Sequence, residues 1–214
     1  IEGNVHKLRS FIEKGYSILI FPEGTRSEDC SILRFHKGAF YLAEKLKVDI
    51  IPLLVHGIGH ALPKTEMMLR KGHVTVDIME RITPEKLCQE GKSVLNASQR
   101  IRTLYTKKYA KLSGEIETAD YFADLVLHNY IYKGAEIEKE ARQLLKNNAN
   151  FANYIATLPD KGEICINDCG IGVKTLMAAL VKKNLHIIAT DKHADQLEIA
   201  RNCTSVPANL TYTN

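Results

Sequence analysis

The chain has 214 residues, of which 45% are hydrophobic and 25% are charged, and its formal net charge at pH 7 is +4. This length allows one or two buried cores, and the composition is ordinary for a globular protein in water. No apolar run approaches the roughly 18 residues that span a bilayer, and the net charge is too small to indicate a nucleic-acid partner. Anionic small molecules and anionic lipid surfaces remain compatible with this charge.

The cysteines and histidines predict neither a disulfide framework nor a metal site. The cysteine count is odd and no two cysteines form a Cys-x-x-Cys pair, so we expect reduced thiols in a cytoplasmic protein. His56, His60 and His73 flank two predicted strands, without a carboxylate at metal-ligand spacing. The five cysteines are Cys30, Cys88, Cys165, Cys169 and Cys203.

Hydrophobic periodicity predicts a mixture of helices and strands in the first half of the chain. Helical spacing occurs at residues 5–12, before a glycine that suits a C-cap (Gly15), at 38–47, and from 84 to about 112. Strand patterns occur at 16–21, 50–55 and 74–79. Pro52 lies within the second strand pattern and predicts an edge position or a distorted pairing there.

The second half predicts helices first and then alternating strands and helices. The helical patterns are 118–133 and 135–158, followed by strand 163–167, helix 173–183, strand 186–190, helix 194–203 and a final strand pattern at 209–214. Such a succession is typical of a parallel doubly wound sheet. The predicted fold class is therefore α/β, with a mixed-sheet domain at 1–113, then a helical lead-in and a partial Rossmann-like parallel sheet at 114–214.

The motif Phe-Pro-Glu-Gly-Thr-Arg-Ser, at residues 21–27, places unusual chemistry directly after a predicted strand. Gly24 permits a sharp turn, and Arg26 offers a planar fork of donors suited to a phosphate or carboxylate. Glu23 can accept a hydrogen bond from a substrate hydroxyl, and Thr25 adds a small donor. On chemistry alone, a phosphate site and a surface turn with a Glu–Arg salt bridge are equally good interpretations.

This motif is similar to the signature block of the glycerolipid acyltransferases, which include lysophosphatidic acid acyltransferases. The segment Arg-Phe-His-Lys-Gly-Ala at 34–39 resembles the family's Phe-Lys-x-Gly segment, and Ile-Ile-Pro-Leu at 50–53 resembles its later Ile-Val-Pro-Val strand. The resemblance covers roughly residues 3–83 and implies an acyl donor, either acyl-CoA or acyl carrier protein. It implies a substrate-binding set for a lysophosphatidic-acid-like acceptor, comprising Glu23, Gly24, Thr25, Arg26, Lys37 and Pro52.

The resemblance also implies a general base that this sequence does not supply. In the family, the histidine of a His-x-x-x-x-Asp motif upstream of this block takes the proton of the acceptor hydroxyl. Only 20 residues precede Phe21, and none of them forms this motif. The one such spacing, from His186 to Asp191, falls in a predicted buried strand and is read as coincidence. We therefore expect a fragment whose base lies upstream of Ile1, with no catalytic residue in the chain and no activity by itself.

A second motif occurs where the strand at 163–167 meets the next helix. Asp168, Gly170 and Gly172 follow the strand, and Asp191 ends the next strand. This pattern resembles class I S-adenosylmethionine-dependent methyltransferases, and these four residues would line the cofactor site. Gly172 would let a ligand approach the backbone closely. Dinucleotide-binding proteins are the alternative; Lys174 and Thr175 stand where third glycines would occur in the two families.

The overall expectation is a piece of a larger fusion that joins an acyltransferase to the start of a methyltransferase-like domain. It resembles bacterial fusions in which a transporter precedes both domains, and we expect it in the cytoplasm at the inner face of a membrane. Two alternatives remain open: methyl transfer as the main activity, and a non-catalytic module that docks a larger protein to a membrane or an acyl carrier. A basic stretch at 100–111 is expected to be a solvated helix face, although it could touch a membrane; its basic residues are Arg100, Arg102, Lys107, Lys108 and Lys111.

Overall fold

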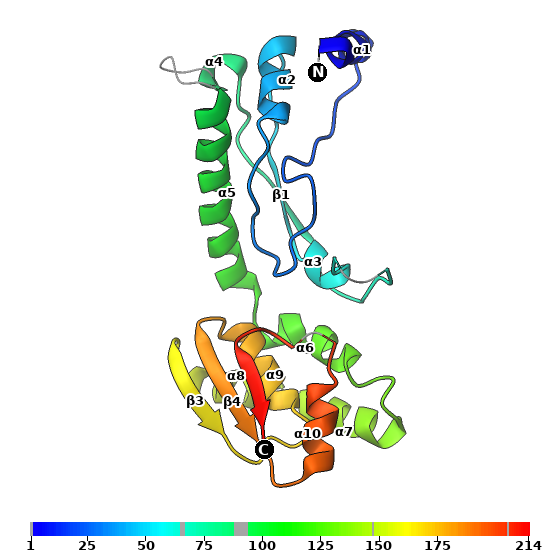
Figure 1. Cartoon of the computed structure of the whole chain (residues 1–214), viewed down its shortest axis with the longest axis vertical. Coiled ribbons are helices and arrows are strands. Elements are labelled where there is room, and N and C mark those ends of the chain that lie inside the picture. Colours follow the sequence, from blue (N-terminus) through cyan, green and yellow to red (C-terminus); the bar gives the residue numbers. More distant parts are fainter. Residues whose placement is uncertain (1, 65–66, 88–93, 147, 205) are drawn as a thin grey trace. The chain divides into compact units, whose positions relative to one another are not determined.

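The computed structural model describes residues 2–64, 67–87, 94–146, 148–204 and 206–214 (Figure 1). Within it the chain forms two compact units. The N-terminal unit comprises Ile1–Leu69 and His73–Ser113, and the C-terminal unit comprises Arg70–Gly72 and Gly114–Asn214. Each unit has its own hydrophobic core.

The N-terminal unit contains mostly helices and one small sheet. Most of the predicted elements are confirmed, and residues 88–93, within the long helical pattern from 84 to 112, lie outside the described part. The elements are α1 (Glu2–Glu13), α2 (Gly38–Leu46), β1 (Leu53–His56), α3 (Ile58–Ala61), β2 (Thr75–Ile78), α4 (Pro84–Leu87) and α5 (Val94–Ile116), whose last turn belongs to the other unit.

The predicted strand at 16–21 is wrong, because these residues pair with no neighbouring strand in the described structure. Their apolar side chains are largely exposed: Leu19 is 71% and Phe21 is 74% exposed. An apolar run satisfies the side-chain pattern of a strand, but a strand also needs a partner for its backbone N–H and C=O groups. In the described residues the sheet of this unit consists of β1 and β2, so the run forms an extended connection from α1 to the turn at 21–27.

Gly15 ends α1 as predicted. Gly15 has φ +84°, its N–H donates to the Ile12 carbonyl at 2.8 Å, and the Tyr16 N–H donates to the Phe11 carbonyl at 3.0 Å. The Phe11 and Tyr16 rings meet edge to face at 5.9 Å. These bonds and this contact form a Schellman motif, which sets the direction in which the chain leaves α1.

The β-ribbon of β1 and β2 is antiparallel, with Leu53 opposite Ile78 and His56 opposite Thr75. Pro52 is buried directly before β1, and its carbonyl accepts the Met79 N–H at 2.9 Å. The distorted pairing predicted from this proline is confirmed, since regular pairing begins only after it. The core of the unit brings together α2, α4, α5 and the loop before α2, through Phe35, Phe40, Ala43, Leu87, Ala97 and Ile101.

The C-terminal unit begins with helices and ends with a parallel sheet. The predicted helix at 135–158 is two helices, and residue 147 between them lies outside the described part. The elements are α6 (Ala119–His128), α7 (Ala135–Leu145), α8 (Asn148–Thr157), β3 (Gly162–Ile166), α9 (Val173–Val181), β4 (Leu185–Thr190), α10 (Ala194–Arg201) and β5 (Leu210–Thr213).

The three strands lie in the order β3-β4-β5, and both neighbouring pairs are parallel. α9 packs on β4 and β5, and Figure 1 shows α8 and α9 behind the three strands. β4 alternates strictly between buried and half-buried residues, with Leu185, Ile187 and Ala189 facing the core. The predicted parallel sheet is therefore present, and the three described strands of this unit run in the same direction.

Candidate functional site

The turn at residues 21–27 closes on itself and on the segment that leads into α2. The Gly24 N–H donates to the Phe21 carbonyl at 3.2 Å, which closes a β-turn, and the His36 N–H donates to the Pro22 carbonyl at 2.7 Å. Gly24 has φ +71°, and a Cβ added there would lie 3.2 Å from the His36 ring. A glycine is therefore required at this position both for its backbone conformation and for space.

Glu23 and Arg26 point to different parts of the unit. The half-buried Glu23 accepts the Leu33 N–H through Oε2 at 2.7 Å. The exposed Arg26 donates from Nη1 to the Leu62 carbonyl at 2.9 Å and to the Pro63 carbonyl at 3.3 Å, just beyond α3. Among the described ion pairs, none joins Glu23 to Arg26. The surface turn with a local Glu–Arg salt bridge is therefore not the arrangement that forms.

The remaining candidate residues of this unit are Thr25, Lys37 and Pro52, and they differ in how closely they are tied to the turn. Thr25 is exposed on the turn itself, and Lys37 is exposed at the N-cap of α2. The bond between Pro22 and His36 brings Lys37 to the turn although the two are far apart in sequence. Pro52 is buried before β1 and shapes the ribbon, and no described contact joins it directly to the turn.

Two residues of α5 contact the region around the turn, and the sequence did not predict these contacts. Arg102 donates to the backbone of the loop after the turn. Tyr105 packs edge to face on Phe35 at 5.1 Å. Burial raises the pKa of Tyr105 to about 12; a backbone hydrogen bond with Leu53 opposes the rise and the negative charge of Glu23 adds to it. Tyr105 therefore lies between the turn and the start of β1.

Basic residues of α5 also bond to other segments of their own unit. Arg100 donates to the Lys86 carbonyl at 2.9 Å, and Lys108 pairs with Asp77 of β2 at 2.9 Å. Together with Arg102, they use three of the five basic side chains that the sequence assigns to a solvated face. The only sequence signal for these contacts is the interleaving of basic and apolar residues.

The turn after β3 is built from residues in the left-handed region of backbone conformation. Asp168 has φ +51°, Gly170 +58° and Gly172 +85°. The Asp191 carboxylate accepts the Gly170 N–H at 2.7 Å and the His193 N–H at 2.9 Å. These backbone bonds, from His193 first and then Gly170, lower the pKa of Asp191. The structure thus brings Asp168, Gly170 and Asp191 together where β3 and β4 end.

A glycine is required at position 172 for packing within the chain, and not for the close approach of a ligand that the sequence suggests. A Cβ at this position would lie 2.6 Å from Tyr212 Oη and 2.7 Å from Ala200 Cβ. The Tyr212 hydroxyl lies 3.1 Å from Thr175 Oγ1, and the Tyr130 hydroxyl donates to the Ile171 carbonyl at 3.0 Å. The chain itself fills the space beside Gly172, whereas a Cβ at Gly170 would meet nothing within 4 Å.

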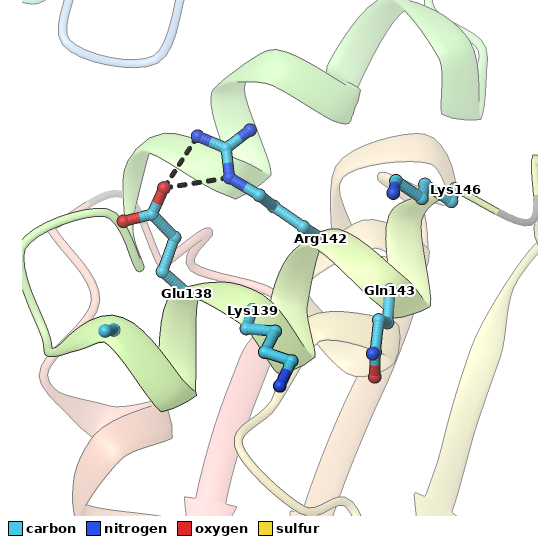
Figure 2. Close-up of a pocket in the computed structure, with 6 residues that line it drawn as sticks. Glu138, Lys139, Arg142, Gln143 and Lys146 are labelled. Atoms are coloured by element: carbon cyan, nitrogen blue, oxygen red, sulfur yellow. Dashed lines mark hydrogen bonds and ion pairs between the residues drawn. The ribbon is translucent and has the colours of Figure 1, made fainter.

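A shallow hollow on α7 offers no comparable site. Its six lining residues all come from residues 135–146, and Figure 2 shows Arg142 donating to Glu138 beside Lys139, Gln143 and Lys146. The Arg142 Nε to Glu138 Oε1 distance is 2.8 Å. One helix provides no opposite wall that could enclose a ligand, so we assign this hollow no function.

The described residues contain no cluster of three or more metal-ligating side chains and no helix both long and apolar enough to cross a membrane. None of the four described cysteines is in a disulfide, and Cys88 lies outside the described part. Burial raises the pKa of the Cys169 thiol to about 11 and also raises that of Cys203, which disfavours reactive thiolates.

Comparison with known proteins points to one family. The acyltransferase family model matches residues 2–56. A 1-acyl-sn-glycerol-3-phosphate acyltransferase of Chlamydomonas reinhardtii is 35% identical over 99 residues, which cover 44% of this chain and 30% of the relative. The chloroplastic enzyme LPAT1 of Arabidopsis thaliana is 40% identical over 91 residues, 41% of this chain and 26% of the relative.

A solved structure also matches. The 1-acyl-sn-glycerophosphate acyltransferase PlsC of Thermotoga maritima is 25% identical, with a TM-score of 0.41 over 49% of this chain and 43% of that one. The chain spans about a third or less of the length of the two curated relatives it matches. The predicted resemblance to acyltransferases is confirmed for residues 2–56.

Proposed function

We propose that this chain provides the acceptor-binding part of an acyltransferase that transfers an acyl group from acyl-CoA or acyl carrier protein to a lysophosphatidic-acid-like acceptor. The observation that carries the proposal is the family match over residues 2–56, which contains the turn at 21–27 and the segment into α2. The relatives are named as 1-acyl-sn-glycerol-3-phosphate acyltransferases.

The exposed groups around the turn suit a phosphorylated acceptor. Arg26 makes its two described bonds from Nη1, and a guanidinium carries further N–H groups on Nε and Nη2 that can bind a phosphate. Thr25 and Lys37 are also exposed, and the bond from His36 to Pro22 brings the residue before Lys37 to the turn. Glu23 uses Oε2 to hold Leu33, so Oε1 can accept the hydroxyl of a glycerol group. Gly24 gives the turn its shape, and Pro52 shapes the edge of the site by setting the start of β1.

The reaction adds the acceptor hydroxyl oxygen to the thioester carbonyl, and the thiol group leaves. A general base removes the hydroxyl proton as this bond forms. We assign no residue of this chain as that base, because no His-x-x-x-x-Asp motif stands among the 20 residues before Phe21. The residues of this chain bind and orient the acceptor.

Titration of the ¹⁵N-labelled chain with glycerol 3-phosphate tests this proposal, with glycerol as the control that lacks the phosphate. We expect saturable shifts of the Gly24, Thr25 and Arg26 amide signals with glycerol 3-phosphate alone. Arg26→Ala should weaken binding by about tenfold, as for loss of a charge-assisted hydrogen bond. Arg81→Ala is the matched control, since Arg81 is exposed and pairs with Asp49 away from the turn. Equal responses to both ligands would overturn the proposal and favour the non-catalytic docking alternative.

For the C-terminal unit, S-adenosylmethionine binding remains a prediction, as does methyl transfer. The open space at Gly170 and the nearby carboxylates of Asp168 and Asp191 favour S-adenosylmethionine binding. The filled space at Gly172 and the backbone bonds of Asp191 show that part of this motif serves the fold.

We also propose a cytoplasmic location at the inner face of a membrane, because the proposed acceptor is a lysophospholipid.

A further inference from the structure

Arg102 lies on α5, far along the chain from the turn at 21–27, yet it holds the loop that follows this turn. Its Nε donates to the Leu33 carbonyl at 2.8 Å, and its Nη2 donates to the Ile32 carbonyl at 3.0 Å. Two parallel bonds from a rigid fork fix both the place and the direction of this peptide segment.

Glu23 holds the same segment as a hydrogen-bond acceptor, whereas Arg102 holds it as a donor. Its Oε2 accepts the Leu33 N–H at 2.7 Å, so Leu33 has its N–H bound by a carboxylate and its carbonyl bound by a guanidinium. We call this arrangement of Glu23, Ile32, Leu33 and Arg102 the Leu33 clamp. Hydrogen bonds to charged groups are stronger than neutral ones, so the clamp is a firm attachment of an otherwise irregular loop.

The Leu33 clamp stands directly before the residues that reach the proposed acceptor site. Phe35 is buried and packs against Tyr105, which lies on α5 one helical turn after Arg102. His36 is bonded back to the turn, and the exposed Lys37 follows it. A shift of residues 32–33 would therefore move His36 and Lys37 relative to Gly24.

We propose that Arg102 is a positioning residue of the acceptor site. It holds residues 32–33 so that Glu23, Arg26 and Lys37 together present their groups to a phosphorylated acceptor. This inference rests on the proposed function. In this proposal Arg102 acts through the loop, which its Nε and Nη2 hold at the Leu33 and Ile32 carbonyls.

The test compares four forms of the chain: the unchanged sequence, Arg102→Gln, Arg102→Lys and Lys107→Gln. Glycerol 3-phosphate titrations give affinities from the Gly24 amide signal, and hydrogen exchange gives the opening of the Leu33 amide. Lys107 is exposed on the same helix, so Lys107→Gln removes one positive charge without touching the clamp. It separates positioning from general attraction of the anion.

We expect Arg102→Gln to weaken binding by about tenfold and to speed exchange at Leu33 by about tenfold, the size of one charge-assisted bond. Arg102→Lys should recover part of the affinity, and Lys107→Gln should match the unchanged chain. Normal Leu33 exchange in Arg102→Gln, or an equal affinity loss in Lys107→Gln, overturns the inference. If the unchanged chain binds and Arg102→Gln binds equally well, only the inference fails. If the unchanged chain does not bind, the proposed function fails with it.

Discussion

Within the motif at 21–27, neighbouring side chains have separate tasks. Glu23 turns inward to the loop at Leu33, whereas Arg26 turns outward to the chain after α3. Both residues therefore contribute to the shape of the proposed acceptor site through contacts within the chain. Substitution of either one can reduce binding by moving backbone as well as by removing a ligand contact, so affinities need a measure of loop structure beside them.

Gly24→Ala should destabilise the N-terminal unit by about 1–2 kcal/mol, because a non-glycine residue is strained at φ +71°. The His36 ring adds a steric part, so His36→Ala in the same chain should relieve some of the loss but not all of it. Urea unfolding followed at the amide signals of this unit measures the change. Gly38→Ala is the control in the same unit: this glycine begins α2 with open space around it and without a positive φ, so alanine should not destabilise the unit. Equal effects at both glycines would contradict the expectation.

At the scale of elements, the turn between β3 and α9 is held by side chains from three different places. Tyr130 follows α6, Asp191 follows β4 and Tyr212 lies on β5, and all three bond the turn or its first helical residues. The turn is therefore fixed by contacts from three separate segments of the chain.

Gly172→Ala should destabilise the C-terminal unit by about 2–4 kcal/mol, since overpacking against Tyr212 and Ala200 adds to backbone strain. Gly170→Ala should cost only the strain, about 1–2 kcal/mol, because its surroundings are open. Thermal unfolding of the two variants, followed by circular dichroism, measures the difference. A larger loss at Gly170 would show that the packing at Gly172 is not tight.

The Asp191 carboxylate predicts that the stability of the C-terminal unit depends on pH. Backbone bonds from His193, and then from Gly170, lower the pKa of this carboxyl below its ordinary value in the folded chain. The stabilisation is therefore complete above that ordinary value and is lost as the pH falls through the lowered, folded-state value. Asp191→Asn should remove this part of the acid sensitivity. The measurement is unfolding free energy between pH 5 and pH 2 for both chains, and parallel curves would contradict the role of Asp191.

The elements show what could be predicted from local sequence and what could not. Strands at β1, β2, β3, β4 and β5 and most helices follow from periodicity. The error at 16–21 arises because pairing depends on a distant partner, which periodicity does not contain. The same limit applies to the site: the motif at 21–27 stands out locally, whereas Arg102 and Tyr105 reach it from a helix whose sequence shows only an amphipathic pattern.

At the scale of the whole chain, the β-ribbon presents one apolar face to solvent. Leu53 and Ile78 face each other across the ribbon, as do Val55 and Val76, and the exposed fractions are 40% for Leu53, 53% for Val76 and 70% for Ile78. Contiguous apolar surface of this kind promotes association in solution. This property belongs to the N-terminal unit and does not require the proposed function.

The double substitution Val76→Thr and Ile78→Thr should reduce concentration-dependent association of the chain. Threonine keeps the preference for strand conformation, so the ribbon should remain folded while its apolar face becomes polar. Sedimentation velocity over a range of protein concentrations measures the effect. Tyr132→Thr is the control, because Tyr132 is 84% exposed but lies outside the ribbon. Unchanged association in the double variant, or an equal decrease in the control, would contradict the expectation.

The contact between Arg102 and the loop also has a consequence for how the chain acquires its structure. The guanidinium is separated from its two carbonyl partners by 69 and 70 residues. During synthesis, the loop at 32–33 leaves the ribosome long before α5 is made, and closure of such long-range contacts is slow compared with helix formation. The nascent loop can form its local bonds to Glu23 and Pro22 early, but the two Arg102 bonds can form only after translation has passed α5.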